Sequence, residues 1–247
     1  IASGAHERFE DFHWGVKVNI GGGKFLYCGW KNLDKRTGFS LTPDCVFPFT
    51  DSSSPIVYSS HCLEHLDDAT VDRVLSEARR IFSGKLVLNI PYLDQVLERW
   101  RAGDFAYFKQ WGMDKLTPAW EKRGVRDTIS ARASMIFCGW WEDEYGDEFC
   151  GERNLEAYHG PAICHDTVYS MILGSGTPHD ISANFVSRVV GNFIHRNAWS
   201  ALEFAELLKK HGFAVESVCK EWIIRQLGET IPTLADQVDI SLYVLCS

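Results

Sequence analysis

An alternation of short apolar runs with amphipathic helical patterns over residues 16–101 most restricts the fold of this chain. Asp68–Phe82 carries apolar residues at three- and four-residue spacing, which is typical of a helix with one buried face. Leu93–Arg101 has a similar pattern. Short β-branched and aliphatic runs predict strands at Val16–Ile20, Trp30–Asp34, Pro55–Ser60 and Lys85–Pro91. Strands that alternate with helices predict an α/β fold whose mainly parallel sheet has helices on both faces.

The regular pattern stops near Gly103 and returns only after Arg196. The stretch between them is rich in aromatic residues, glycine and histidine, and its periodicity is poor. A helix is then predicted over Trp199–His211, and strands over Val215–Glu221 and Asp239–Cys246. A chain of 247 residues is long enough for one large domain. The predicted organisation is a single domain over 1–247 with three parts, namely a core at 16–102, an insertion at 103–196 and closing elements at 197–247.

Charge and cysteine content argue against several classes of protein. The formal net charge is −8, and a surface of that sign repels phosphate backbones, so no nucleic-acid partner is expected. No apolar run approaches the roughly 18–20 residues that span a bilayer, so no membrane partner is expected. The eight cysteines are scattered without a C-x-x-C pair. This spacing argues against a zinc knuckle or a disulfide framework, and it predicts a reducing, cytoplasmic location.

Three consecutive glycines, Gly21, Gly22 and Gly23, follow the first predicted strand. Glycines at a strand end let a ligand approach the backbone, because no Cβ intervenes. An ordinary tight turn is the alternative. Asp34 ends the second predicted strand, where its carboxylate can accept hydrogen bonds from both ribose hydroxyls. A turn-forming role is the alternative for Asp34.

The path from the glycines to the second strand distinguishes between cofactors. A dinucleotide site needs a helix N-terminus after the glycines to receive the pyrophosphate. Only Lys24–Gly29 separates the glycines from Trp30, whereas a full crossover takes about a dozen residues. The chain also reads G-G-G-K-F-L and not G-x-G-x-x-G. These features favour a nucleoside ligand without a pyrophosphate over NAD.

Four blocks of sequence resemble a known family. They are V-N-I-G-G-G…G-W-K-N-L-D, F-P-F-T-D-S-S-S-P-I-V-Y-S-S-H-C-L-E-H-L, the L-S-E-A-R-R-I-F helix and G-K-L-V-L-N-I-P. In order and spacing they are similar to class I S-adenosylmethionine (SAM)-dependent methyltransferases, and most similar to the methyltransferase-11-like branch. The resemblance covers residues 16–94. Gly22 stands where the family commonly has Cys, and Pro55 where it often has Asp.

This resemblance implies a Rossmann-like, seven-stranded, mostly parallel sheet with an antiparallel last strand. It implies SAM as the cofactor, S-adenosylhomocysteine as the product, a SAM-binding core at 16–102 and an acceptor region at 103–196. SAM would lie across the glycine turn, with Asp34 on the ribose, the adenine near Asp44–Val46 and the methionine part near Ser60 and His61. The residues that it assigns to the cofactor are Gly21, Gly22, Gly23, Asp34, Asp44, Cys45, Ser60 and His61.

His61 is the candidate catalytic base. It follows a predicted strand at the edge where cofactor and acceptor would meet, and a neutral imidazole there can take a proton from an acceptor hydroxyl. The alternative is that His61 only orders the loop. Glu64 and His65 are expected to cap and support the following helix. His61 and His65 have the i, i+4 spacing of a zinc pair, but no third ligand is evident nearby in the sequence, so no metal is expected.

The insertion is expected to carry acceptor specificity, because loops on a rigid α/β scaffold often carry binding residues. Trp140, Trp141 and His165 are its candidate substrate contacts, and the alternative is that its aromatic residues form a small core of their own. The expected reaction is methyl transfer to a hydroxyl of a small-molecule or glycan acceptor. An N-methyltransferase and an inactive SAM-fold binding protein are the alternatives. The sequence leaves open whether the chain forms a homo-oligomer.

Overall fold

The computed structural model describes residues 15–23, 25–109, 126–138, 166–188, 195–227, 231 and 241–247. A six-stranded sheet of order β2-β1-β3-β4-β6-β5 organises this part of the chain. Its strands are β1 (Val18–Ile20), β2 (Lys31–Leu33), β3 (Ser54–Ser60), β4 (Phe82–Pro91), β5 (Val215–Ser217) and β6 (Ser241–Cys246). The pairs among β1 to β4 are parallel, and β6 is antiparallel to both of its neighbours. The predicted mostly parallel sheet with an antiparallel last strand is therefore confirmed.

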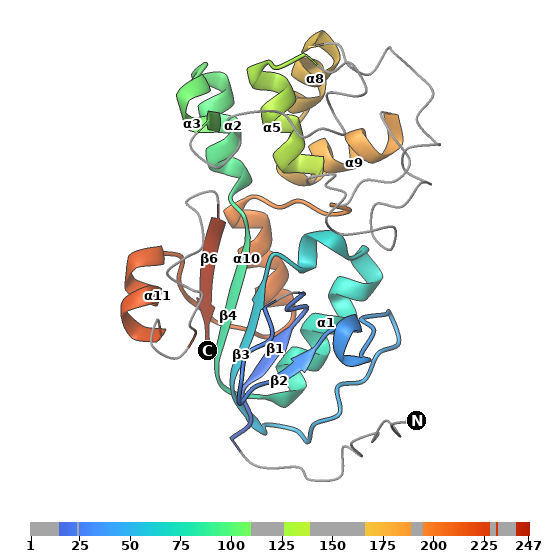
Figure 1. Cartoon of the computed structure of the whole chain (residues 1–247), viewed down its shortest axis with the longest axis vertical. Helices are drawn as coiled ribbons and strands as arrows, with labels where there is room; N and C mark the ends of the chain where they lie inside the picture. Colours follow the sequence, from blue (N-terminus) through green and yellow to red (C-terminus); the bar gives the residue numbers. More distant parts are fainter. Residues whose placement is uncertain are drawn as a thin grey trace, which may run out of the picture.

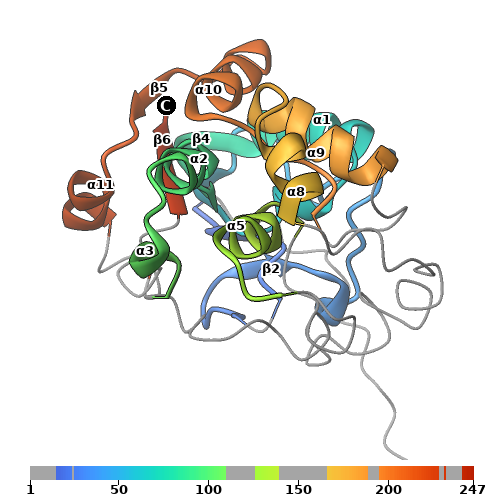
Figure 2. The same cartoon turned by 90° about the horizontal axis from the view of Figure 1, so that it is seen from above.

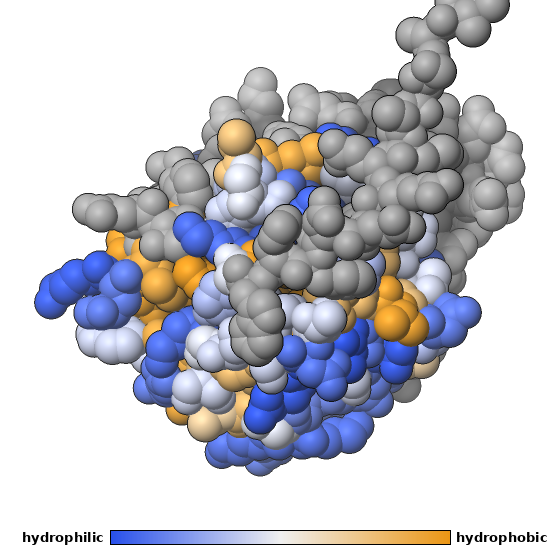
Figure 3. Space-filling view, turned by 90° about the horizontal axis from the view of Figure 1, so that it is seen from below, coloured by the Kyte–Doolittle hydropathy of each residue, from blue (hydrophilic) through white to orange (hydrophobic). Residues whose placement is uncertain are grey.

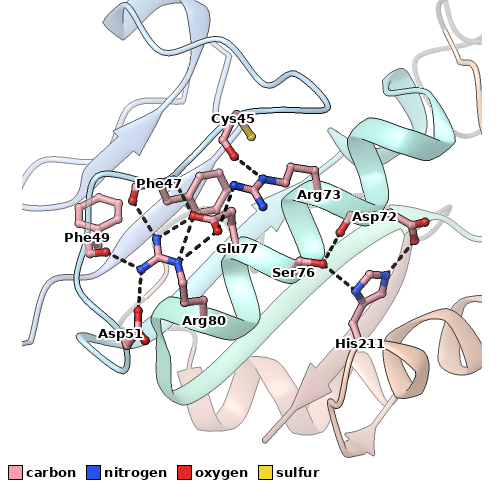
Figure 4. Close-up of polar contacts among 10 residues, drawn as sticks. All are labelled: Cys45, Phe47, Phe49, Asp51, Asp72, Arg73, Ser76, Glu77, Arg80 and His211. Carbon is pink, nitrogen blue, oxygen red and sulfur yellow. Dashed lines mark hydrogen bonds and ion pairs between the residues drawn. The ribbon is translucent and has the colours of Figure 1, made fainter.

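Six strands are described, where the resemblance implies seven. Between β2 and β3 the chain forms a 3-10 turn, η1 (Lys35–Thr37), and then an irregular segment that continues to residue 53. Three side chains of helix α1 (Asp68–Ile81) bind backbone groups of this segment, namely Arg73, Glu77 and Arg80 (Figure 4). Pro48 in the same segment has no N–H to offer a neighbouring strand. A strand would need the backbone groups that α1 occupies, so none forms there.

Helices cover both faces of the sheet, as predicted (Figure 1). On one face, Val74 and Phe204 belong to the same buried cluster as Leu86 of β4. On the other face, Ile223 is buried with Val87, the next residue of β4. Successive residues of a strand point to opposite faces, so β4 contributes to both cores. Besides α1, the helices of these layers are α10 (Ala201–Lys210) and α11 (Lys220–Leu227).

The core elements lie close to their predicted positions. Asp67 caps α1, and its side chain accepts a hydrogen bond from the Thr70 N–H at 2.8 Å. Helix α2 (Leu93–Arg101) has the predicted bounds. The exception follows β5, which was expected to continue to Glu221. Glu221 instead lies in α11, because that helix turns its apolar side chains toward the second core cluster.

The insertion is helical in the part that the structure describes. Its helices are α3 (Phe105–Lys109), α5 (Ile129–Cys138), α8 (Asp166–Leu173) and α9 (Pro178–Arg188). Together with α2 they gather at the end of the sheet toward which β4 leads (Figures 1 and 2). Helix α5 contacts the other four helices of this layer, and every residue from 130 to 137 is buried. A helix that is buried all round has no amphipathic period, which explains the poor periodicity of this stretch.

The opposite end of the molecule is shown in Figure 3. Hydrophilic residues cover much of the coloured surface there, with apolar residues in smaller patches between them. Among the helices in the described ranges, none combines the length and the apolar character that crossing a membrane requires.

Candidate functional site

The strand order reverses between β1 and β3. The chain passes from β1 outward to β2 on one side, and from β3 outward to β4 on the other. Ligands of open α/β sheets bind outside the carboxyl ends of the strands at such a switch point. Gly21 directly follows the end of β1, and His61 directly follows the end of β3. The topology therefore places the glycine turn and His61 at the same edge of the sheet.

The glycine turn requires glycine for two separate reasons. Gly21 and Gly23 have φ angles of +64° and +53°, which side-chain-bearing residues rarely adopt. A Cβ on Gly21 would lie 2.0 Å from Sγ of Cys62, and a Cβ on Gly22 would lie 2.3 Å from Nδ2 of Asn19. Around a Cβ on Gly23 no atom of the described residues lies within 4 Å. Space and conformation thus both require glycine at Gly21, whereas at Gly23 only the backbone conformation does so among the described residues.

Asp34 closes the glycine turn. The Gly23 N–H donates to its Oδ2 at 2.9 Å, and the Arg36 N–H donates to its Oδ1 at 2.9 Å. Each carboxylate oxygen can accept a second hydrogen bond, so the carboxylate can still receive two vicinal hydroxyls. No helix occurs among the described residues 25–30 that lead from the turn to β2. A helix N-terminus that could receive a pyrophosphate is therefore absent from that described stretch.

Two further residues assigned to the cofactor, Asp44 and Cys45, lie in the irregular segment before β3. Asp44 is exposed, and the hydrogen bond from the Thr42 hydroxyl at 2.7 Å lowers the pKa of its carboxyl group. Cys45 is buried, and its carbonyl accepts a hydrogen bond from Arg73 of α1. Asp34 thus bonds directly to the glycine turn, whereas Cys45 is held by α1.

A partly buried ion pair on α1 fixes the rest of this segment (Figure 4). Glu77 accepts a hydrogen bond from the Phe47 N–H at 2.8 Å and pairs with Arg80 at 2.7 Å. Arg80 also donates to the carbonyls of Phe47 and Phe49. Burial works to raise the pKa of Glu77, but the hydrogen bonds from Arg80 and Phe47 outweigh it and lower that pKa. The sequence offered no signal for this network, because its partners lie about 30 positions apart.

His61 is held by two side chains, one on each ring nitrogen. Its Nδ1 lies 3.1 Å from Oε1 of Glu64, and its Nε2 lies 2.8 Å from Oγ of Ser241. Because a carboxylate can only accept, Nδ1 carries the proton, and in the neutral ring Nε2 then accepts from the serine hydroxyl. The backbone of His61 has a φ of +47°, which is uncommon for a non-glycine residue. The imidazole thus presents a basic lone pair at Nε2, as a general base must.

Glu64 has a different role from the predicted one. Asp67, not Glu64, caps α1, and the Glu64 side chain is 1% exposed and turned to His61. Burial alone raises the pKa of Glu64, but the hydrogen bond from His61 and the neighbouring imidazoles outweigh it and lower the pKa to about 2. Glu64 is therefore charged at neutral pH and holds the His61 ring in one tautomer. Burial raises the pKa of the neighbouring Cys62 thiol to about 12, so Cys62 stays a neutral core group.

The segment 195–197, where the insertion ends, docks on the turn η2 (Leu63–His65). The Glu64 carbonyl accepts two backbone hydrogen bonds from this segment, at 2.7 and 3.0 Å. His195 is buried there, and its Nδ1 lies 3.0 Å from the carbonyl of Ile136 in α5. The rings of His65 and His195 meet edge to face, with centroids 4.8 Å apart. Burial lowers the pKa of His195 to about 3, so its ring is neutral.

The remaining predicted cofactor residue is Ser60, the last residue of β3, whose hydroxyl accepts a hydrogen bond from Asn89 at 3.2 Å. Trp140, Trp141 and His165 lie outside the described residues. The sequence analysis missed Ser241, because its partner His61 is 180 positions away. No local pattern could have revealed that contact.

Comparison with known proteins gives structural likeness only. No family model matches the chain, and no curated protein matches its sequence. The chain is similar to a SAM-dependent methyltransferase from Mesorhizobium loti, with 15% identity and a TM-score of 0.38, over 95% of this chain and 90% of that one. It is also similar to a SAM-dependent methyltransferase from Thermotoga maritima named as a possible histamine N-methyltransferase, with 16% identity and a TM-score of 0.32, over 81% and 64% of the two chains.

A further likeness is to PKMT2 from Rickettsia typhi, with 12% identity and a TM-score of 0.39. It covers 94% of this chain and 48% of that one, so the chain spans about half the length of PKMT2. Another structure of PKMT2, similar to this chain at a TM-score of 0.35, is a complex with AdoHcy. The α/β fold class of this chain rests on its own strand order and register, and the site rests on the contacts described above.

Proposed function

We propose that the chain is a class I SAM-dependent methyltransferase. The observation that carries the proposal is the turn Gly21–Gly23, closed by the Asp34 carboxylate at the switch point of the sheet. No atom of the described residues lies within 4 Å of a Cβ on Gly23, and Asp34 keeps acceptor capacity for two ribose hydroxyls. The described residues 25–30 contain no helix to receive a pyrophosphate. These features fit a nucleoside cofactor of the SAM type better than NAD.

His61 supports transfer to a hydroxyl. When bound, SAM supplies an activated methyl group, so the protein needs to orient the acceptor and remove its proton. Nε2 of His61 already accepts a hydrogen bond from the Ser241 hydroxyl, in the same way as it would accept one from a substrate hydroxyl. The Glu64 carboxylate holds the ring from the other side and balances the positive charge that forms when Nε2 takes a proton. We therefore propose O-methylation, with His61 as the base and Glu64 as its positioning residue.

The acceptor side is assigned to the helical layer built from the insertion. That layer gathers at the end of the sheet toward which β4 leads, and His61 and the glycine turn lie at the same carboxyl edge (Figure 1). An element at this edge can cover the transferred methyl group and exclude water. The proposed acceptor is a small molecule or a glycan.

Calorimetric titration of the tag-free chain with SAM, S-adenosylhomocysteine and NAD tests the cofactor. We expect binding of SAM and its product and no binding of NAD. Mass spectrometry of ligands that co-purify with the chain gives an independent reading. Tight NAD binding without a response to SAM would overturn the proposal. A methyl-transfer screen on sugars, phenols and amines then tests the acceptor class, and transfer to amines alone would replace O-methylation by N-methylation.

A further inference from the structure

The contact between η2 and the end of the insertion contains a group of metal-ligating side chains, and the proposed reaction uses only one of them, Glu64. Glu64, His65 and His195 each bring one ligand atom, and these three atoms lie within 4.8 Å of one another. His65 is beside Glu64 in the sequence, whereas His195 is about 130 positions away, so no local spacing links it to the other two. We propose that these three side chains form a binding site for a divalent transition-metal ion.

The Glu64 carboxylate gives a second, independent indication of a ligand. Its side chain is 1% exposed, and its Oε1 is engaged by His61. Its Oε2 is buried and has no hydrogen-bond partner among the described residues. A buried carboxylate oxygen without a partner costs free energy, which a bound cation would remove. The unsatisfied oxygen thus belongs to the carboxylate that lies beside the two imidazoles of the cluster.

His195 is oriented as a metal ligand would be. Its Nδ1 lies 3.0 Å from the carbonyl of Ile136, and a carbonyl can only accept, so Nδ1 carries the proton. The lone pair of His195 is therefore at Nε2, away from that hydrogen bond. Metal-binding histidines commonly donate their second ring N–H to a backbone carbonyl, which fixes the ring and its tautomer. The Ile136 carbonyl performs that function here.

Two imidazoles and one carboxylate suit zinc-like ions. Zn²⁺ sites with three protein ligands of this kind keep a further position for water, and the same ligand set also binds Fe²⁺. Ligand distances of about 2.0–2.2 Å would bring the ligand atoms to roughly 3.3–3.6 Å from one another. The widest pair, now within 4.8 Å, would have to close by somewhat more than an ångström. His65 is only partly buried, so the movement is asked mainly of the least enclosed of the three side chains.

The surrounding backbone already holds the ligands near one another. The Glu64 carbonyl accepts hydrogen bonds from the N–H groups of Arg196 and Asn197, directly after His195. The Asn197 side chain donates to the carbonyl of Leu66 at 2.8 Å, directly after His65. A metal ion at this place would join η2 of the core to the end of the insertion and, through His195, to α5. It would thereby fix the acceptor region against the cofactor region.

Metal titration of the tag-free chain, without SAM or acceptor, tests this site independently of the proposed methyl transfer. The protein is stripped with a chelator, dialysed and titrated with Zn²⁺ by calorimetry, and Co²⁺ is added to a second sample to record its visible absorption. We expect one Zn²⁺ per chain, a rise in melting temperature with Zn²⁺, and Co²⁺ bands typical of nitrogen and oxygen ligands. Failure of the folded chain to bind Zn²⁺ stoichiometrically overturns the proposal, whatever its activity toward SAM.

His65→Gln and His195→Gln identify the ligands, and His211→Gln is the matched control. His211 also contacts a carboxylate, that of Asp72 at 2.9 Å, but on the α1–α10 contact (Figure 4). Each cluster variant should weaken Zn²⁺ binding by more than the roughly 10–100-fold that loss of an outer-shell partner causes. The control should bind like the unchanged chain. Should His195→Gln not fold, as judged by circular dichroism, His65→Gln still decides. Unchanged Zn²⁺ affinity in folded His65→Gln overturns the assignment.

Discussion

His61 and Ser241 lie 180 positions apart in the sequence, yet Nε2 of the histidine is 2.8 Å from Oγ of the serine. Ser241 is the first residue of β6, which pairs antiparallel with β4 so that Ser241 stands opposite Pro91. The antiparallel direction of β6 therefore brings the start of this strand to the edge where the parallel strands end. The serine hydroxyl occupies the lone pair that an acceptor hydroxyl would need.

Single substitutions of His61 and of Ser241 should separate a catalytic role of the histidine from a structural role of the pair. We expect His61→Gln to lower turnover by about 10²–10⁴-fold, which is the usual contribution of a general base. Its SAM affinity should stay within a few-fold of that of the unchanged chain. Ser241→Ala leaves the Nε2 lone pair in place, so turnover should be retained. Single-turnover kinetics with a hydroxyl acceptor measures both. Equal losses in the two variants would show that the pair is structural only.

Asp34→Asn should weaken SAM binding with little change in folding. Hydrogen bonds to a charged acceptor are worth about 1.5–3 kcal/mol, so the dissociation constant should rise roughly ten- to a hundredfold. Calorimetry measures the affinity, and a thermal scan checks the fold. Glu206→Gln, which removes an exposed carboxylate of α10, is the matched control and should bind normally. A folded Asp34→Asn variant with unchanged affinity would remove Asp34 from the cofactor site.

Alanine at the two positive-φ glycines should have unequal effects on stability. Gly23→Ala should cost only the left-handed backbone penalty of about 1–2 kcal/mol, because no atom of the described residues lies within 4 Å of the new Cβ. Gly21→Ala should cost more, since its Cβ would lie 2.0 Å from Sγ of Cys62. Urea unfolding of both variants gives the two free energies. Equal values would contradict the described packing of Cys62 under the turn.

Acid should selectively remove the contribution of Glu77. Its hydrogen bonds to Arg80 and Phe47 lower its folded-state pKa below the ordinary value of 4.5. A carboxyl with a depressed pKa stabilises the fold fully above the unfolded pKa, and this stability is lost as the pH falls through the folded value. Glu77→Gln should therefore be less stable than the unchanged chain by about 1–3 kcal/mol at pH 7. The difference should narrow below pH 4.5 in thermal scans, and a constant difference would contradict the ionised pair.

Substitutions in the acceptor region should leave SAM binding intact. We expect Trp140→Ala, Trp141→Ala and His165→Ala to lower turnover or raise the acceptor KM while the SAM dissociation constant stays within a few-fold. Each kinetic measurement needs a thermal scan, because a tryptophan that serves as core lowers the melting temperature when it is lost. Parallel loss of SAM binding and acceptor kinetics in folded variants would contradict the division between core and acceptor region.

Local sequence patterns predicted the central elements of the fold, which carry either one apolar helix face or a continuous apolar run. The periodicity of α1, the apolar runs of β3 and β4 and the closing strand β6 all match the described structure. Helix α5 escaped prediction because it is buried on every side and so lacks the contrast that marks an amphipathic helix. The missing strand before β3 had another cause, because α1 side chains from about 30 positions away bind its backbone.

The candidate site also contains a part that the sequence predicts and a part that only the tertiary fold brings together. The Gly21–Gly23 turn and Asp34 are close in sequence, and Gly23 bonds directly to Asp34. Ser241 and His195 reach the His61–Glu64 region only through the tertiary fold, so no spacing in the sequence could reveal them. The identity of Glu64 was visible, but its burial and its bond to His61 were not. Local geometry was therefore predictable, whereas the partners that tune the chemistry were not.

The two edge strands of the described sheet, β2 and β5, have only three residues each. Exposed edge strands are templates for pairing with other chains, and short ones are a common protection against aggregation. Three residues offer few unpaired backbone groups on which an incoming strand could register. An incoming strand, in strand exchange or fibril growth, can therefore form few backbone hydrogen bonds at either edge. Self-association of this chain should accordingly proceed through side-chain surfaces and not by the joining of sheets.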